Sequence, residues 1–201
     1  MPLIVFEGID GCGKTTQTEI LCHTLTQQQT PFRRLREPGT TALGEATRRI
    51  LLDPATTASP TAELFAYLMA RAQLCDEVLR PSLAAGEVVI LDRFWYSTIA
   101  YQAFGLGLPQ ELVRAANRLA VGELVCDLAL WFDLEPQLAV QRRATVAPDR
   151  IEARGLAYLE RVRAGYQSLC ARQELRRIDA HRPIAAIATD VWDLVRPLLP
   201  A

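Results

Sequence analysis

The chain has 201 residues, of which 50% are hydrophobic and 22% are charged. This length and mixture fit one globular domain, or one domain with a mobile insert, and exclude an intrinsically disordered, collagen-like or disulfide-dense protein. With 22 basic and 23 acidic residues the net charge is −1, so no global positive field would hold nucleic acid or an anionic membrane.

Short apolar runs typical of buried strands alternate with helical patterns along the chain. The predicted strands are Leu3–Glu7, Phe32–Arg36, Val88–Asp92, Leu128–Asp133 and Arg177–Asp179. The predicted helices are Lys14–Gln28, Leu43–Leu52, Ala62–Ala85, Ser97–Ala103, Gln110–Ala120, Pro136–Arg143, Gly155–Gln173 and a last one after Pro183. The last helix has the clearest periodicity, because apolar residues recur at helical spacing from Ile184 to Leu198.

Strands separated by helices predict a single α/β domain, residues 1–201, with a five-stranded parallel sheet covered by helices on both faces. Ligands of such sheets bind beyond the carboxyl ends of the strands. The five cysteines are odd in number and show no Cys-x-x-Cys spacing, which argues against disulfides and a zinc site. No apolar run reaches the roughly 18 to 20 residues of a membrane span, and no basic segment precedes the first apolar stretch. We therefore expect a cytoplasmic protein without a membrane partner.

A phosphate-binding loop follows the first strand. The segment Gly8-Ile9-Asp10-Gly11-Cys12-Gly13-Lys14-Thr15 matches G-x-x-x-x-G-K-[ST] between a strand and a helix, which is the context that this motif requires. Glycines let backbone N–H groups turn inward around a phosphate, and the helix N-terminus adds partial positive charge. Lys14, the only lysine beside 21 arginines, would reach the β- and γ-phosphates of ATP, and Thr15 would ligate Mg²⁺. Residues Gly8, Ile9, Asp10, Gly11, Cys12, Gly13, Lys14, Thr15 and Thr16 are the predicted ATP-binding set.

A carboxylate that helps to position the metal is expected at the end of a strand. Asp92 ends Val88-Val89-Ile90-Leu91, and Asp133 ends a competing segment of the same pattern. We favour Asp92 because Arg93 follows it and places a cation at the ligand-binding edge of the sheet. A strand-end aspartate is also a common helix cap or loop residue, so either position alone is a weak signal.

The motifs decide between two classes of phosphate-loop protein: switches or motor ATPases, and enzymes that phosphorylate a small acceptor. A GTPase reads guanine with Asn-Lys-x-Asp, which cannot occur here because Lys14 is the only lysine. Many motor ATPases carry Glu after the strand-end Asp to activate water, whereas Arg93 stands here, and no Leu-Ser-Gly-Gly-Gln segment of a transporter ATPase is present. Arginines near the strand ends suit phosphoryl transfer between two nucleotides, because an acceptor phosphate is already anionic and needs no strong base.

Several motifs in one order resemble the bacterial thymidylate kinases. They are Phe6-Glu7-Gly8 to Thr16, Arg36-Glu37-Pro38-Gly39-Thr40, Asp92-Arg93-Phe94, Ser97-Thr98-Ile99-Ala100-Tyr101-Gln102 and Asp149-Arg150-Ile151-Glu152. The resemblance runs from the first strand to the last helix. It implies a three-layer α/β/α phosphate-loop fold with a short mobile lid over about residues 142–152. It further implies transfer of the γ-phosphate of MgATP to dTMP, giving dTDP, by a homodimer.

The resemblance also implies an acceptor-phosphate site. Asp10 would point toward the deoxyribose 3′-hydroxyl and the arginine beside it, although it could be a simple turn residue. Arg93 would grip the acceptor phosphate, assisted by Arg48, which could equally be a surface arginine. Glu37 and Pro38 of the Arg-Glu-Pro-Gly element would complete this wall.

For the nucleoside, the resemblance implies that Arg71 reads the base and that an aromatic ring one helical turn earlier stacks on it. Tyr67 has that spacing, where the family often has Phe, and Phe65 is the alternative in another register. Thr98 and Gln102 would hydrogen-bond the pyrimidine. Tyr101 would lie against the sugar 2′ carbon and exclude a ribose hydroxyl.

In the lid, the resemblance implies a catalytic arginine, because members of the family with glycine at the position of Gly11 supply it from there. Arg142, Arg143 and Arg150 are the candidates; we favour Arg143 and Arg150, since Arg142 fits an exposed helix charge. Two other functions remain open from the residues: a kinase for another nucleoside monophosphate, and a nucleotide-binding protein with little catalysis.

Overall fold

The computed structural model describes residues 1–145 and 147–199. Five parallel strands form one sheet in the order β2-β3-β1-β4-β5. They are β1 (Leu3–Glu7), β2 (Phe32–Arg36), β3 (Val88–Asp92), β4 (Leu128–Asp133) and β5 (Arg176–Asp179). The predicted parallel sheet is confirmed, and only β5 begins one residue earlier than expected.

The helices also lie where the apolar periodicity placed them. They are α1 (Lys14–Gln27), α2 (Ala42–Leu52), α3 (Pro60–Leu74), α4 (Arg80–Ala84), α5 (Trp95–Thr98), α6 (Gln110–Val121), α7 (Pro136–Arg142), α8 (Leu156–Ala171) and α9 (Ile184–Val195), with short 3-10 turns at Glu152–Arg154 and Arg196–Leu198. In the described part of the chain, no helix is both long enough and apolar enough to cross a bilayer.

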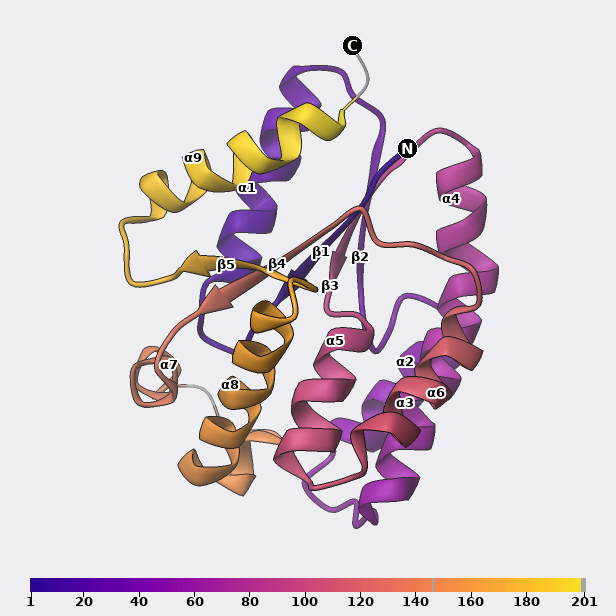
Figure 1. Ribbon diagram of the computed structural model, residues 1–201, viewed down its shortest axis with the longest axis vertical. Helices are drawn as coiled ribbons and strands as arrows, with labels where there is room; N and C mark the ends of the chain where they lie inside the picture. Colours follow the sequence, from indigo (N-terminus) through magenta and orange to yellow (C-terminus); the bar gives the residue numbers. More distant parts are fainter. Residues whose placement is uncertain (146, 200–201) are drawn as a thin grey trace.

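The helices form a layer on each side of the sheet, as Figure 1 shows. Helices α1 and α9 pack together on one face, while α3 to α6 and α8 lie on the other. The central strand β1 is buried along its whole length, because both of its faces are covered and both of its edges are paired. The three-layer α/β/α architecture predicted from the sequence is therefore confirmed.

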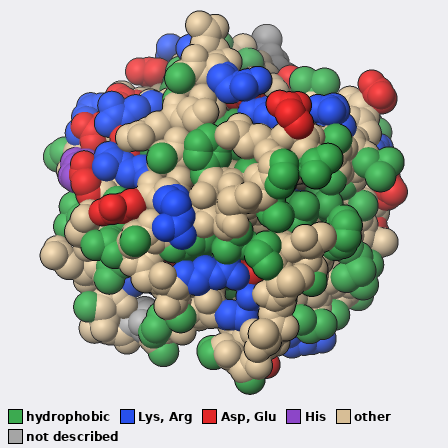
Figure 2. Space-filling model, turned by 60° about the horizontal axis from the view of Figure 1, so that its bottom comes forward, with side chains coloured by type: hydrophobic (Ala, Val, Ile, Leu, Met, Phe, Trp, Pro, Cys, Tyr) green, Lys and Arg blue, Asp and Glu red, His purple; other side chains and the backbone are tan. Residues whose placement is uncertain are grey.

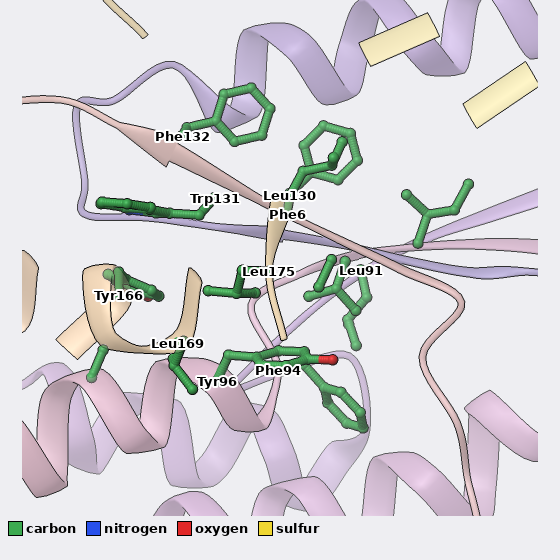
Figure 3. Packing of buried hydrophobic residues seen from close by; sticks show 14 of the residues in the cluster. Phe6, Leu91, Phe94, Tyr96, Leu130, Trp131, Phe132, Tyr166, Leu169 and Leu175 are labelled. Carbon is green, nitrogen blue, oxygen red and sulfur yellow. The ribbon is translucent and has the colours of Figure 1, made fainter. Parts of the chain in front are cut away.

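Buried side chains that follow one another along a strand point alternately to the two faces of the sheet (Figure 3). Phe6 of β1 stacks on Phe132 of β4, with ring centroids 5.3 Å apart. The neighbouring Trp131 points to the opposite face and stacks on Tyr166 of α8 at 5.8 Å. Since successive side chains of a strand point to opposite faces, a single strand can bind helices on both sides.

Two predicted helices contain π-helical turns that the periodicity did not reveal. The expected helix Ala62–Ala85 is interrupted at Cys75–Leu79, directly before Pro81. Proline lacks a backbone N–H, and its ring clashes with the preceding turn of an α-helix. The wider π turn gives the ring of Pro81 more room, so the segment stays helical. The expected helix Ser97–Ala103 continues as a π turn over Ile99–Gly105, in the segment expected to contact the nucleoside.

Candidate active site

The phosphate-binding loop connects β1 to α1 at the carboxyl edge of the sheet. Gly8, Gly11 and Gly13 have φ values of 136°, 86° and 98°, which L side chains rarely adopt. The buried Lys14 extends over the loop and donates from Nζ to the carbonyl oxygens of Gly8 at 2.8 Å and Ile9 at 3.1 Å. The loop therefore has the backbone conformation that its motif predicts.

Gly11 is also required by tertiary packing. A Cβ at this position would lie 2.5 Å from the carbonyl oxygen of Ala139 in α7. A larger residue, arginine included, would have to push α7 away from the loop. The fold therefore leaves no room for a cationic side chain at position 11.

Asp10 lies at the meeting point of three cations. Its Oδ1 accepts from Arg93 Nη2 at 2.9 Å and lies 3.7 Å from Lys14 Nζ, while its Oδ2 lies 3.6 Å from Arg143 Nη1. Burial by itself would raise the pKa of Asp10, but the charges of Arg93 and Lys14 outweigh it and lower the pKa well below 3.8. Asp10 is therefore an ionised bridge between the phosphate loop and the end of β3, not a simple turn residue.

Glu7, the last residue of β1, bonds several residues around Arg93, although the sequence analysis gave it no role. Its Oε1 accepts from the backbone N–H of Phe94 at 2.8 Å, and its Oε2 accepts from Ser97 Oγ at 2.6 Å and Tyr166 OH at 2.8 Å. Ser97 and Tyr166 in turn accept from Arg93 at 3.3 and 3.5 Å. Glu7 therefore positions Arg93 through its neighbours.

Replacing Glu7 by glutamine is expected to change the pH dependence of stability. Burial raises the pKa of Glu7 above 4.5, outweighing the Ser97 hydrogen bond and the Arg93 charge. Between 4.5 and the folded-state pKa, the folded protein holds a proton that the unfolded chain has lost, so the free energy of unfolding falls as pH rises through this window. Urea unfolding from pH 4 to 8 should show this fall in the wild type and a smaller one in Glu7→Gln. Parallel pH profiles for the two proteins would contradict the assignment.

A pocket opens beside Asp10. Its wall contains the predicted residues Asp10, Glu37, Pro38, Arg48, Tyr67, Arg93, Thr98, Tyr101 and Gln102, together with Leu52, Ser97, Asp149 and Ile151. Arg48 is half-buried and donates from Nη1 to the carbonyl oxygen of Pro38 at 3.0 Å, so it belongs to the pocket and not to the open surface. Tyr67 lines the pocket, whereas Phe65 is 61% exposed. The register with Tyr67 is therefore the one the fold adopts. Figure 2 shows Lys and Arg side chains around a hollow near the centre of the face it presents.

Arg71 lies behind this pocket in a buried hydrogen-bond network, in which only Glu37 Oε1 lacks a partner among the described residues. Its guanidinium donates to Glu37 Oε2 from Nε at 2.8 Å and from Nη2 at 2.6 Å, and from Nη1 to Thr98 Oγ1 at 2.6 Å. Nη1 also donates to Oδ1 of Asn117 in α6. Arg71 and Glu37 have side chains only 2% and 3% exposed. The network joins α3, α5 and α6 to the segment after β2, next to the pocket.

A second pocket lies over the phosphate loop. Residues Gly11 to Gln17 form one wall, and Arg142, Ala180, Arg182, Ile184 and Ile187 form the other. Thr15 belongs to this wall, and Asp92 ends the neighbouring strand with its buried Oδ1 lacking any hydrogen-bond partner among the described residues. Asp133, the competing strand-end carboxylate, pairs instead with Arg163 and Arg177 at 2.7 Å each.

The two favoured lid arginines have different surroundings. Arg143 bonds Glu152 and lies beside Asp10. Arg150 donates to the carbonyl oxygen of Leu51 and to Glu63 Oε2, both at 2.7 Å, so it is committed away from the phosphate loop. Val146, inside the expected lid, lies outside the described residues. Mobility of the lid stays a prediction.

Two buried polar residues of this site escaped the sequence analysis. Glu63 accepts from Gln102, Arg150 and Arg154, and Asn117 accepts from Arg71. A signal for Glu63 existed, because Glu63, Tyr67 and Arg71 are spaced by four residues and share one face of α3. Asn117 had no such signal, since its partner lies 46 residues away.

Comparison with known proteins gives one consistent family. The family model for thymidylate kinase matches residues 6–191. The chain is 44% identical over 193 residues to a thymidylate kinase of Synechococcus sp. (strain CC9311), covering 92% of this chain and 91% of that protein. It is 45% identical over 200 residues to that of Synechococcus sp. (strain RCC307), covering 96% and 94%. It is 43% identical over 197 residues to that of Gloeobacter violaceus, covering 96% and 93%.

Proposed function

Because the chain belongs to the thymidylate kinase family, we propose that it transfers the γ-phosphoryl group of ATP to dTMP, releasing ADP and dTDP. An oxygen of the dTMP phosphate forms the new bond to phosphorus, and the bond to the β,γ-bridging oxygen of ATP breaks. The observation that carries the proposal is the position of Asp10, a residue of the phosphate loop that also lines the pocket containing Arg48 and Arg93 and pairs with Arg93. Two anionic substrates on either side of this carboxylate would bring their phosphates to the same cations.

Arg93 and Arg48 would hold the acceptor phosphate. Arg93 is fixed by Asp10, Ser97 and Tyr166, and its guanidinium lies 5.0 Å from the ring centroid of Tyr101. A guanidinium held in one orientation binds phosphate with two parallel hydrogen bonds. Because its position is set before substrate binds, little reorganisation is needed during transfer.

Lys14 and Arg143 would stabilise charge on the transferred group. Lys14 extends over the phosphate loop, and Arg143 lies on the other side of Asp10. A phosphoryl group in transit spreads its charge over three oxygens, so cations from both sides lower its energy. The lid carrying Arg143 would also exclude water from the γ-phosphate.

Asp92 and Thr15 would hold Mg²⁺. The carboxylate and hydroxyl oxygens are hard ligands of the kind that Mg²⁺ prefers, and the unpartnered Oδ1 of Asp92 is an available ligand at the correct edge of the sheet. When bound, Mg²⁺ supplies charge neutralisation of the nucleotide phosphates.

A coupled ADP-release assay with MgATP and a panel of nucleoside monophosphates tests the proposal. We expect turnover with dTMP, weaker turnover with dUMP, and loss of both in a Lys14→Ala control, which excludes a contaminating kinase. Turnover confined to another monophosphate would overturn the base assignment. ATP binding without turnover on any acceptor would instead favour a nucleotide-binding protein with little catalysis.

Tyr101 is expected to set the preference for deoxyribose. It lies 8% exposed in the wall of the nucleoside pocket, where its ring would fill the space that a 2′-hydroxyl needs. Tyr101→Ala should lower the ratio of kcat/KM for dUMP over UMP by about tenfold or more. Tyr101→Phe is the matched control and should keep the ratio, since the ring remains. An unchanged ratio in the alanine variant would place the sugar elsewhere.

We further propose that the protein is a homodimer through α2, α3 and α6. Helix α3 packs between α2 and α6, and the three carry the exposed side chains Leu43, Ile50, Phe65, Met69, Leu112 and Leu119. Figure 2 shows hydrophobic side chains gathered on the right of the visible face. An apolar surface of this kind is typical of an interface between copies. Sedimentation equilibrium should show a dimer that Phe65→Glu converts to monomer; a wild-type monomer would refute the proposal.

We propose the cytoplasm as the site of action. The five cysteines are free in the structure, which suits a reducing compartment.

A further inference from the structure

The buried carboxylate of Glu63 has a bonding pattern that the proposed chemistry does not use. It belongs to α3, and its side chain is fully buried. Arg154 donates to both of its oxygens, at 3.1 Å to Oε1 and 2.5 Å to Oε2. Arg150 adds a bond to Oε2 at 2.7 Å, and Gln102 adds one to Oε1 at 3.0 Å. One carboxylate therefore binds Arg150 of the lid, Arg154 just beyond it, and one amide of the nucleoside pocket. We call the segment from Arg150 to Arg154 the lid end.

The two arginines neutralise a charge that the fold has taken out of water. Burial would raise the pKa of Glu63, but the hydrogen bonds from Arg154 and Gln102 outweigh it and hold the pKa below 4.5. A buried carboxylate that loses its cationic partners is strongly destabilising. If Arg150 and Arg154 moved away with an opening lid, Glu63 would keep only Gln102 and whatever water entered. The carboxylate therefore favours the conformation in which the end of the lid is docked.

The same carboxylate restricts Gln102. Because a carboxylate can only accept hydrogen bonds, the Gln102 side chain must turn its NH₂ group toward Glu63. This leaves the amide carbonyl oxygen for the nucleoside. Arg154 also donates to Tyr158 OH at 3.0 Å, and Tyr158 donates to the carbonyl oxygen of Tyr101 at 3.3 Å. The lid end and the substrate-facing π turn are thus bonded to one another through Glu63 and Tyr158.

We propose that Glu63 is a positioning residue that anchors the end of the lid to the wall of the nucleoside pocket, so that nucleoside binding and lid closure depend on one another. Arg150 is then an anchor of the lid, which leaves Arg143, of the two favoured arginines, to act on the phosphates. This inference rests on the proposed kinase function for its kinetic consequence, but the anchoring itself is a property of the folded chain.

The variant Glu63→Gln tests the proposal, with Glu174→Gln as the matched control. Glu174 also pairs with two arginines, Arg114 and Arg172, at 2.9 Å each, on a different part of the surface. In Glu63→Gln we expect kcat to fall by about tenfold to a hundredfold, because a small displacement of positioned groups has that effect. KM for dTMP should rise several-fold and KM for ATP should stay within about twofold, since the donor pocket does not include Glu63. The control should keep all three parameters.

Limited trypsin digestion gives a readout that needs no activity. Trypsin cuts after arginine, and the wild-type bonds should protect the peptide bonds after Arg150 and Arg154. Cleavage there, identified by mass spectrometry, should accelerate by about tenfold in Glu63→Gln but not in Glu174→Gln. Addition of dTMP should slow these cuts in the wild type and not in Glu63→Gln. If Glu63→Gln does not fold, Arg154→Lys provides a second test. The Arg154 side chain is partly exposed, and lysine cannot make its paired bonds to Glu63, so cleavage in this variant should accelerate in the same way.

Each result decides the proposal. Cleavage as slow as in the wild type in both Glu63→Gln and Arg154→Lys would overturn the proposal that Glu63 anchors the lid end, even if kcat fell. Faster cleavage with unchanged kcat and KM would overturn the coupling to catalysis. A wild-type protein without turnover on any monophosphate would refute the proposed function, whereas the cleavage pattern would still decide the anchor.

Discussion

Replacing Arg93 by alanine is expected to lower kcat by about 10³-fold, within the range found for arginines that stabilise phosphoryl transfer. The side chain lies between Asp10, Ser97 and Tyr166 and contacts the face of Tyr101. No other described arginine bonds Asp10 of the phosphate loop at a distance as short as 2.9 Å. Its loss would remove the group proposed to align the acceptor phosphate and would leave Asp10 with less charge compensation.

Steady-state kinetics with saturating ATP and dTMP measure this effect. Arg93→Lys is the matched control: it keeps the charge but cannot donate to two oxygens in one plane, so it should fall between the wild type and the alanine variant. ADP affinity should be retained in both variants, because the donor pocket is formed by other residues. A kcat within tenfold of wild type in Arg93→Ala would remove Arg93 from the acceptor site.

Replacing Arg71 by methionine is expected to lower the free energy of unfolding by about 3–5 kcal/mol, the cost of leaving a buried charge without its partner. Glu37 is 3% exposed in its side chain, and Oε2 receives both of its hydrogen bonds from Arg71. Methionine has a similar length and fills the space without restoring either bond. Thr98 and Asn117 would also lose a donor.

Urea denaturation measures the loss, and the double variant Arg71→Met with Glu37→Gln identifies its cause. Removing the carboxylate charge should recover part of the lost stability, because the uncompensated charge disappears. Because Arg71 is the residue expected to read the base, neither the single nor the double variant should bind dTMP, which calorimetry would show. A single variant that loses less than about 1 kcal/mol would mean that the pair is solvated or dispensable.

Local signals were sufficient for the elements and for the phosphate loop. The apolar runs of β1, β3 and β4 are buried between two helical layers, so their hydrophobicity is continuous and easy to read. The loop motif depends on glycines and Lys14 within eight consecutive residues, and its conformation follows from their backbone freedom. The sequence analysis predicted a helix over Ala62–Ala85 but not the π turn at Cys75–Leu79 inside it.

The amino-acid sequence by itself determined the succession of strands and helices along the chain, the phosphate loop, and the residue types that gather at the carboxyl ends of the strands. Only the tertiary structure decided which arginine serves which carboxylate. Arg150 and Glu63 are 87 residues apart, and Arg71 and Asn117 are 46 apart, so no periodicity along the chain can pair them. Such pairs form because folding removes their charges and dipoles from water together, and a buried polar group is stable only beside a partner that the packing of distant elements brings to it.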